Sequence, residues 1–386
     1  MSLYETHTDI NYEQNIPIYY WLSSTLSVGA AALSRLNNAF DNLYSFYELP
    51  DDKLASLNIL TDGQAEKLIY LRNKYNIFDE YKRLAEHGIT FYPIIHPNFP
   101  KKLRSIPNPP IGIYFIGALP SPTTPSVAVI GARECSAYGE DIAAMLGRAL
   151  GRNKIPLISG MARGIDSLSQ NAAINAGGPS FAVLGGGVDI CYPKESRKLY
   201  ETLKHTGGII SEFPPGTAAT RSRFALRNRL ISGLSDIVTV VEARKKSGTL
   251  ITVDDALEQG REVYTVPGRI TDSTAEGCNM LIHQGAGIIY DIDAFIAEIP
   301  GIKNVISDNV PDSCNNIELS SLSKWILTNV GNESFMPADL LGHKHITSDE
   351  AIMCTSQEVM IECLKLCELG LVKSLGGNRF KKVYAD

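Results

Sequence analysis

SVAVIGARECSAYG, residues 126–139, decides the fold, because an apolar run is followed at once by small residues and then by a helical stretch. PLISGMARGID (156–166) and SFAVLGGGVDICYP (180–193) repeat this order. The runs are apolar at nearly every position, as in parallel strands that helices cover on both faces. The alternation predicts an α/β fold with a Rossmann-like, mostly parallel sheet and helices on both faces.

The rest of the chain divides around this region. Residues 1–90 carry apolar residues at helical spacing and predict a helical domain. The proline-rich residues 91–125 predict a connector with one short strand, GIYFIG, before the Rossmann-like domain at 126–300. The polar residues 301–316 predict a linker, and the order of helices and a β-ribbon over 317–386 predicts a winged-helix domain.

The composition is that of a globular protein without a membrane segment. Hydrophobic residues make up 44% of the 386 residues and charged residues 20%. No apolar run approaches the roughly 20 residues that a membrane helix needs. The N-terminus has no basic start and no apolar segment, unlike a secretory signal. We therefore expect no membrane contact and a cytoplasmic location.

The seven cysteines form no Cys-x-x-Cys pair, which argues against a zinc knuckle. One interpretation of Cys363 and Cys367 is a metal site that they form with the nearby residues His343, His345 and Cys354. We prefer the alternative that the two cysteines are small apolar residues on a buried helix face.

Small residues follow each of the first three predicted strands: Gly131 ahead of Arg133, Ser159 with Gly160, and Gly186 in a triple glycine. Ligands of open α/β sheets bind beyond the carboxyl ends of the strands, near the point where the strand order reverses. Loops that lead into helices present amides and a positive dipole to anions. The three loops therefore predict an anion-binding rim, although glycines also serve tight turns alone.

Familiar cofactor and catalytic patterns are missing from the sequence. The first loop is not Gly-x-Gly-x-x-Gly, and no ATP-type P-loop occurs, so we expect no cofactor. Asp166, Asp189, Glu212 and Glu242 at strand ends or helix starts suit acid–base chemistry, but more often such residues cap helices.

The densest positive run begins at Arg221 and continues through Arg223, Arg227 and Arg229, with Phe224 among them. Guanidinium groups bind phosphates, and an aromatic ring stacks on bases. These two kinds of contact are the minimum for a site that binds a single-stranded nucleic acid. The formal net charge of −6 means that any such site is a local patch. The alternative is a purely structural interpretation, in which the arginines lie at a solvent-exposed helix end and Phe224 packs in the core.

Two of these arginines have a second interpretation. Arg227 and Arg229 are also expected to pair structurally with Asp236 or Glu242. The Arg-Lys-Lys run at 244–246 either extends the basic edge or is a solvated turn.

Eight motifs together resemble the DNA-processing protein A (DprA/Smf) family by their order and spacing. The motifs are GARECSAYG (131–139), SGMARGID (159–166), AVLGGGVDICYP (182–193), SEFPPGT (211–217), RFALRNRLISGLSD (223–236), VVEARKKSGTLIT (240–252), ALEQGREVYTVPG (256–268) and GCNMLIHQGA (277–286). The chain departs from the family at Ser169-Gln170, where Ala-His is usual, and at Ala225, where Pro is usual.

The resemblance implies a non-catalytic protein that binds single-stranded DNA and helps to load the RecA recombinase, in natural transformation and homologous recombination. It also implies a homodimer, a SAM-like or helix-hairpin-helix domain at the N-terminus and a winged helix at the C-terminus. Carried over to this chain, it gives as DNA-binding residues Gly131, Arg133, Ser159, Gly160, Gly186, Arg221 and Phe224. The two basic runs add Arg223, Arg227 and Lys245 as secondary candidates.

Two other functions stay open at this point. A Rossmann nucleotide hydrolase would carry a Pro-Gly-Gly-x-Gly-Thr loop, and the comparable stretch here, EARKKSGTLIT, has no Pro-Gly-Gly. A structural adaptor would act through the winged helix.

Overall fold

The computed structural model describes residues 12–300 and, further on, residues 320–330, 334–340, 345–346, 351–352, 355–368, 371–376 and 378–382. The chain divides into two compact units, Met1–Val305 and Ile306–Asp386. The linker predicted at 301–316 lies outside the described residues. No helix in the described ranges is both long enough and apolar enough to cross a membrane.

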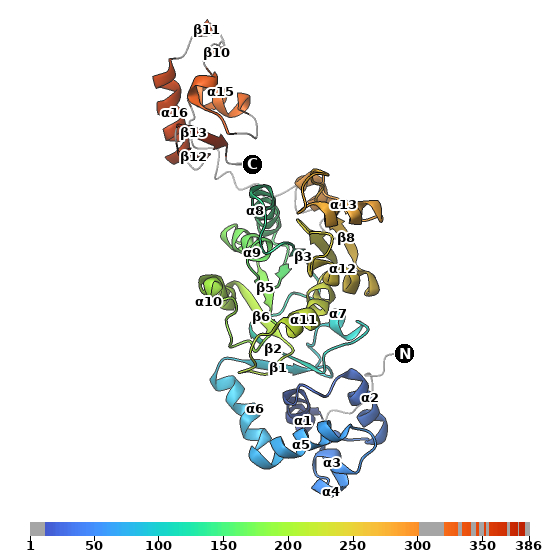
Figure 1. Cartoon of the computed structure of the whole chain (residues 1–386). Coiled ribbons are helices and arrows are strands. Elements are labelled where there is room, and N and C mark those ends of the chain that lie inside the picture. The colour runs from blue at the N-terminus through green and yellow to red at the C-terminus, as the bar shows by residue number, and fades with distance from the viewer. Residues whose placement is uncertain are drawn as a thin grey trace. The chain divides into compact units, whose positions relative to one another are not determined.

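A nine-stranded sheet forms the middle of the first unit, with the order β1-β2-β6-β5-β4-β3-β7-β8-β9 (Figure 1). The strands from β3 to β9 pair in parallel, whereas β1 and β2 are antiparallel to their neighbours. The strand order reverses between β3 and β7, so the switch point lies at the carboxyl ends of these two strands. The strands are β1 (Thr90–Pro93), β2 (Gly112–Gly117), β3 (Val127–Ile130), β4 (Leu157–Ser159), β5 (Ser180–Val183), β6 (Gly207–Ser211), β7 (Ile237–Val240), β8 (Glu262–Thr265) and β9 (Gly287–Ile288).

Helices cover both faces of this sheet, which confirms the predicted α/β class. Val127 and Val129 of β3 face a core shared with α8 (Ala137–Arg152), α9 (Ile165–Asn175) and α14 (Ile292–Glu298). Ala128 and Ile130 face the opposite core, with α11 (Arg221–Leu234) and α12 (Thr249–Glu258) (Figure 1). This alternation is the two-residue period of a strand buried on both faces. Residues 126–300 also contain the helices η2 (Lys194–Ser196), α10 (Arg197–Thr206) and α13 (Glu276–His283).

The N-terminal helices pack on β1 and β2. Trp21 in α1 is fully buried and donates its indole N–H to the Leu68 carbonyl at 3.0 Å. The Ser23 and Tyr114 hydroxyls lie 2.5 Å apart and join α1 to β2. The predicted helical region therefore belongs to the same compact unit as the sheet. Its helices are α1 (Tyr12–Ser24), α2 (Ala30–Ala39), α3 (Leu43–Tyr47), α4 (Asp51–Ala55), α5 (Asp62–Lys74) and α6 (Ile77–Glu86).

The segment predicted as a connector with one strand contributes two strands to the sheet, which corrects that expectation. Pro93 lies in β1, at the edge of the sheet, where a missing amide donor disrupts no second neighbour. The other prolines fall mostly in the turns around α7 (Lys101–Arg104). The Lys102 ammonium lies 2.5 Å from the Asp236 carboxylate and ties this segment to the start of β7.

The second unit contains the predicted helical stretches and ends in the predicted antiparallel hairpin, β12 and β13, but a short antiparallel pair, β10 and β11, that the sequence did not predict lies before its last helix. Its assignment as a winged helix stays a prediction. Cys363 is buried in the apolar core of this unit, and the described residues contain no group that could hold a metal ion. His343 and Cys354 lie outside the described residues. The elements are α15 (Ser321–Asn329), η3 (Pro337–Leu340), β10 (His345–Ile346), β11 (Ala351–Ile352), α16 (Ser356–Glu368), β12 (Val372–Gly376) and β13 (Arg379–Lys382).

Candidate nucleic-acid interface

Helix α11 is anchored to the carboxyl edge of the sheet by Arg227. Its buried guanidinium donates from Nη1 to the carbonyl of Gly160 at 3.1 Å and to that of Val183. Burial lowers the pKa of Arg227 to about 10, against the opposing effect of the Asp166 charge, so the guanidinium stays charged at neutral pH. Arg227 thus positions α11 over the ends of β4 and β5.

The ion pairs expected for Arg227 and Arg229 with Asp236 or Glu242 are wrong. Arg229 instead binds both carboxylate oxygens of Glu212, at 2.7 and 2.5 Å. Asp236 directly precedes β7 and therefore lies at the amino edge of the sheet, whereas both arginines contact groups at the carboxyl edge. Arg227 and Arg229 are therefore close to Asp236 in the sequence but contact the opposite edge of the sheet.

The glycines of the strand-end loops make room for α11 and for the segment that leads into it. A Cβ on Gly185 would lie 2.6 Å from the ring of Phe224, and one on Gly186 would lie 2.8 Å from the Thr217 carbonyl oxygen. A Cβ on Gly160 would lie 2.7 Å from the Arg227 guanidinium. Side chains at these positions would push α11 away from the sheet.

Several polar groups of the predicted amide rim already have partners within the protein. The Gly160 amide donates to Asp166 at 3.1 Å, and the buried Ser159 hydroxyl donates to the Val129 carbonyl at 2.7 Å. At the start of α8, Glu242 accepts hydrogen bonds from the amide and the hydroxyl of Ser136, at 2.9 and 2.6 Å. A protein carboxylate therefore occupies the α8 N-terminus, and side chains supply most of the positive charge at this edge.

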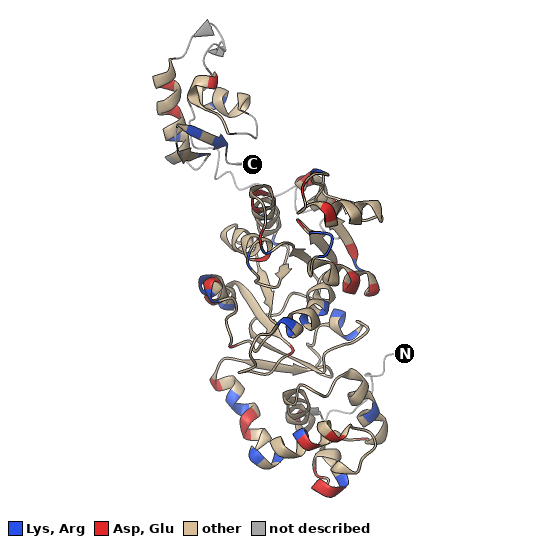
Figure 2. Ribbon diagram, in the orientation of Figure 1, with Lys and Arg blue, Asp and Glu red and all other residues tan. Residues whose placement is uncertain are grey.

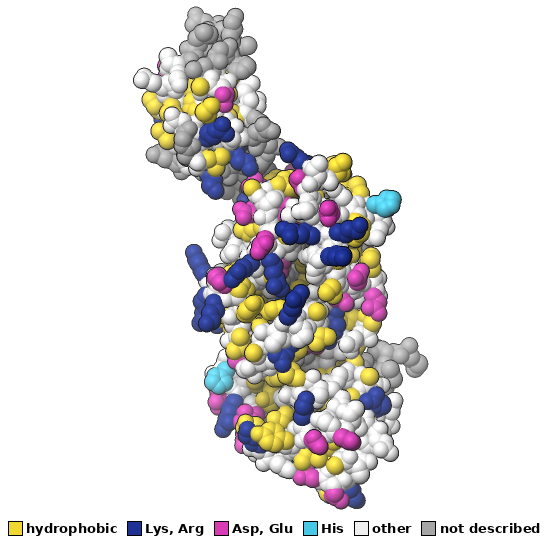
Figure 3. All heavy atoms as spheres, in the orientation of Figure 1, with side chains coloured by type: hydrophobic (Ala, Val, Ile, Leu, Met, Phe, Trp, Pro, Cys, Tyr) yellow, Lys and Arg dark blue, Asp and Glu magenta, His cyan; other side chains and the backbone are white. Residues whose placement is uncertain are grey.

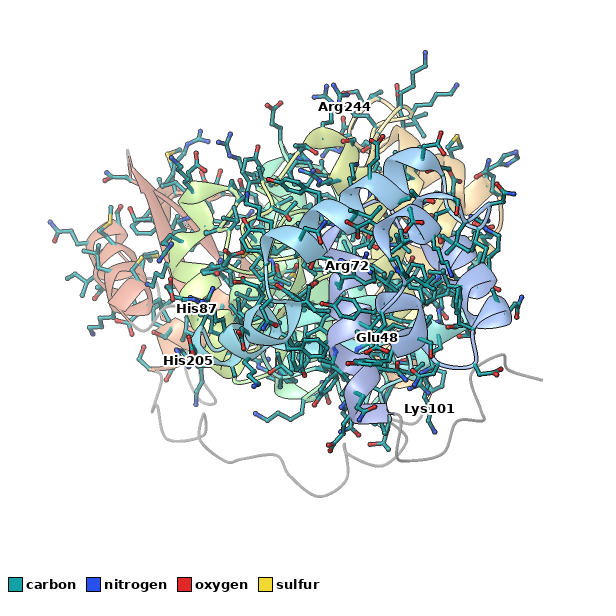
Figure 4. All side chains as sticks on the ribbon, turned by 90° about the horizontal axis from the view of Figure 1, so that it is seen from below. Glu48, Arg72, His87, Lys101, His205 and Arg244 are labelled. Atoms are coloured by element: carbon teal, nitrogen blue, oxygen red, sulfur yellow. The ribbon has the colours of Figure 1, made fainter. Side chains whose placement is uncertain are left out.

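A hollow of about 740 Å³ opens at the switch point, and we call it the switch-point hollow. Its walls are the loop after β3, the first turns of α11 and the loop ahead of α12. Figure 3 shows Lys and Arg side chains gathered on this part of the unit, and Figure 2 marks their positions along the ribbon. Figure 4 shows the Arg244 side chain reaching away from the ribbon. The basic side chains that line the hollow are Arg133, Arg221, Arg227, Arg244 and Lys246.

A second hollow of about 290 Å³ lies beside the first and is called here the glycine-loop hollow. The loops after β4 and β5 form its floor, with Gly160 and Gly186 among the lining residues. Arg133, Tyr192, Phe224 and Arg227 line both hollows, so the two adjoin each other.

An aromatic pair stands where the two hollows meet. The ring centroids of Tyr192 and Phe224 are 5.2 Å apart, with the ring planes at 31°. The Arg133 guanidinium carbon lies 5.4 Å from the Phe224 centroid. Positive charge and aromatic surface are thus adjacent, as binding of a nucleic-acid strand requires.

Most of the predicted site residues come together around this pair. Gly131, Arg133, Gly160, Gly186, Arg221, Phe224 and Arg227 line one or both hollows. Three others lie outside the lining of both hollows. They are Ser159, whose hydroxyl bonds to Val129, Arg223, which donates to the Ala218 carbonyl at 2.6 Å, and the exposed Lys245.

Sequence reasoning missed Tyr192. From the basic run at 244–246, which follows β7 after three residues, it chose Lys245 as a site residue, whereas Arg244 and Lys246 line the switch-point hollow. Tyr192 gave no signal, because its position beside Phe224 depends on the course of the loop after β5.

Residues 90–300 match the model of a family described as DNA recombination-mediator protein A. The chain is 33% identical to Protein Smf of a Synechocystis species over 289 residues, which are 73% of each chain. It is also 33% identical to the DNA processing protein DprA of Streptococcus pneumoniae over 236 residues, which are 61% of this chain and 83% of that protein.

Solved structures are similar as well. The structure of DNA processing protein A from Streptococcus pneumoniae superposes with a TM-score of 0.63 at 29% identity, covering 76% of this chain and 99% of that one. A structure that reports the single-stranded DNA binding mode of DNA processing protein A from Helicobacter pylori has a TM-score of 0.50 at 28% identity. It covers 54% of this chain and 94% of that one.

Proposed function

The chain belongs to the DNA recombination-mediator protein A family, and we propose that it binds single-stranded DNA in the two hollows at the carboxyl edge of its sheet. The binding needs no cofactor and is not part of a catalytic cycle. The similarity to a protein whose single-stranded DNA binding mode has been reported supports this ligand.

The convergence of Arg133, Arg221 and Phe224 carries the proposal. Arg133 follows β3 and the other two open α11, yet all three line the switch-point hollow. Exposed guanidinium groups attract the phosphates of a strand, and the aromatic residues offer a surface for unpaired bases. A local cluster of this kind holds a polyanion although the chain carries a net charge of −6.

The aromatic pair favours a single strand over a duplex. In a duplex the bases are paired and stacked on each other, so their faces are not free to meet Phe224 or Tyr192. An unpaired strand exposes its base faces and contacts cations and aromatic rings together. We expect sequence-tolerant binding, because every base has such a face.

The test is fluorescence anisotropy with labelled single-stranded and double-stranded oligonucleotides. The triple variant R133A/R221A/F224A is compared with a control, K67A/Y70A/K198A, whose changes fall on exposed residues outside both hollows. We expect the wild type and the control to bind the single strand and the triple variant to lose most of that affinity. Unchanged affinity of a folded triple variant would refute the proposed site. We expect the oligonucleotide to be recovered intact after incubation, which checks that the protein does not cleave the strand.

We further propose that the protein acts as a homodimer that passes its bound strand to the RecA recombinase, in natural transformation and homologous recombination. Family membership supports this role. Light scattering reports the mass in solution. A RecA ATPase assay on strands precoated with single-strand binding protein reports loading. A monomeric mass, or no acceleration by the protein, would contradict the corresponding part of the proposal.

A further inference from the structure

We propose that the β-hairpin of the second unit, formed by β12 and β13, binds the phosphate backbone of double-stranded DNA. This site goes beyond the proposed function, because it takes another form of DNA at another unit of the chain. The charge, register and burial of the hairpin residues support it.

Positive charge is concentrated in the hairpin, although the second unit as a whole is acidic. Residues 372–382 hold four of the seven Lys and Arg residues of Ile306–Asp386 and none of its eleven Asp and Glu residues. The four cations are Lys373, Arg379, Lys381 and Lys382. A local basic patch on an otherwise acidic body attracts a polyanion to that patch.

Three of these cations share the outer face of the hairpin. Lys373 lies directly opposite Lys381 in the antiparallel register, and Arg379 is two residues from Lys381 along β13. Residues that are directly opposed, or two apart in one strand, point to the same side of a sheet. The other side faces the core of the unit, where Val372 and Phe380 are each 2% exposed.

The cations of the outer face are arranged for an anion from outside the unit. Like charges directly opposite each other on a sheet repel, and Lys373 and Lys381 form such a pair. The chain has no acidic residue from 369 to 385 that could offset them within the hairpin. Lys382 on the core side differs, since its ammonium donates to the Leu327 carbonyl at 2.7 Å. A bound phosphate relieves the repulsion on the outer face.

The surface of the hairpin suits a phosphate backbone better than unpaired bases. Among its described residues, 372–376 and 378–382, the one aromatic ring belongs to Phe380 and is buried. Unpaired bases bind by stacking on aromatic rings, as proposed for the first unit. A duplex keeps its bases stacked and presents one negative charge per about 1.7 Å of its axis, more than a single strand does. The hairpin therefore favours a duplex, without preference for sequence.

Helix α16 offers a duplex much less than the hairpin does. Its large exposed side chains are Ile361 and Leu364, which are 54% and 50% exposed and carry no charge. Its one cation, Lys365, lies 3.0 Å from the Glu362 carboxylate, and the exposed Glu358 in its first turn repels phosphates. Contacts with DNA therefore go through the hairpin, and they are made to phosphates and not to base edges.

The test is fluorescence anisotropy of the full chain with a labelled blunt duplex that has G·C-rich ends, at several salt concentrations. Each cation that neutralises a duplex phosphate contributes about −0.9 to the slope of log affinity against log salt, so K373A/R379A should reduce its magnitude by about 1.8. This variant should also bind the duplex more weakly. K373R/R379K keeps both charges and should bind like the wild type. The control K67A/K324A removes two exposed lysines, on α5 and α15, and should retain the slope of the wild type.

Measurements with a single strand separate the hairpin from the hollows of the first unit. We expect K373A/R379A to bind the single strand like the wild type, and R133A/R221A/F224A to keep its affinity for the duplex. A wild type that binds no duplex, or wild-type duplex affinity and slope in K373A/R379A, would refute the hairpin site and leave the proposed function standing.

Two further outcomes are equally decisive. Loss of duplex binding in R133A/R221A/F224A but not in K373A/R379A would place the duplex in the hollows and refute the hairpin site. A wild type that binds the duplex through the hairpin but no single strand would refute the proposed function alone. K373Q/R379Q, which keeps more of each side chain, replaces K373A/R379A if thermal unfolding shows that the alanine variant is not folded.

Discussion

The Arg133 guanidinium carbon lies 5.4 Å from the centroid of the Phe224 ring, although one residue follows β3 and the other opens α11. The contact brings together the loop after the first parallel strand and the basic helix, so it defines the centre of the proposed interface. Gly185 makes it possible, since a Cβ there would overlap the Phe224 ring.

Removing one cation from the switch-point hollow should change the salt dependence of binding. Each phosphate that a cation neutralises on a single strand contributes about −0.7 to the slope of log affinity against log salt. We expect R133A and R221A each to reduce the magnitude of the slope by about 0.7, and K198A on α10 to leave it unchanged. Titrations at four or more salt concentrations measure the slope. Slopes equal to that of the wild type would mean that these arginines do not contact phosphates.

Replacing Arg227 should affect stability first. R227M removes the guanidinium donor from the carbonyls of Gly160 and Val183 and the charge that offsets buried Asp166. We expect the free energy of unfolding to fall by ~3 kcal/mol, measured by urea denaturation. R221A, at an exposed position on the same helix, should unfold like the wild type. An R227M variant of wild-type stability would contradict the anchoring role.

Glu242 is expected to stabilise α8, with no part in acid–base chemistry. Its carboxylate binds the amide and hydroxyl of Ser136 at the helix N-terminus. E242A should lower the free energy of unfolding by ~1 kcal/mol, whereas E140A at an exposed position of the first turn of α8 should have a smaller effect. A larger loss for E140A than for E242A would argue against this cap.

Asp255 should make stability depend on pH. Burial raises the pKa of this carboxyl to about 6, only partly opposed by the charge of Arg229. Because the folded-state pKa exceeds that of the unfolded chain, the free energy of unfolding falls as the pH rises from about 4 to above 6. D255N removes this dependence.

Melting temperatures at pH 4 and pH 7.5 measure the effect. D255N should gain stability relative to the wild type at pH 7.5 and show little gain at pH 4, with D254N, at the exposed neighbouring position, as the control. An equal gain at both pH values would mean that the titration of Asp255 does not cause the pH dependence of stability.

The parallel sheet could be predicted from the sequence because its strands are buried on both faces and carry uninterrupted apolar runs. The edge strands β1 and β2 were harder to predict, since prolines surround them and their partners lie far along the chain. Pro93 indicated a connector, but a proline is tolerated on an edge strand.

The candidate site was predictable where charge is dense along the chain and unpredictable where folding decides the contact. The arginines of α11 form a visible cluster, so Arg221 and Phe224 were found. The role of the glycines was misjudged in part, because their amides suggested anion binding whereas several of them serve the close approach of α11. Tyr192 meets Phe224 only through the tertiary fold.

Photo-crosslinking tests the central claim most directly. A single-stranded oligonucleotide carrying 5-bromodeoxyuridine is irradiated with the full chain, and the modified peptides are identified by mass spectrometry. The interface proposed here predicts crosslinks within residues 131–134, 184–193, 219–228 and 244–249. Crosslinks confined to the N-terminal helices at 12–86 or to the C-terminal unit would contradict it.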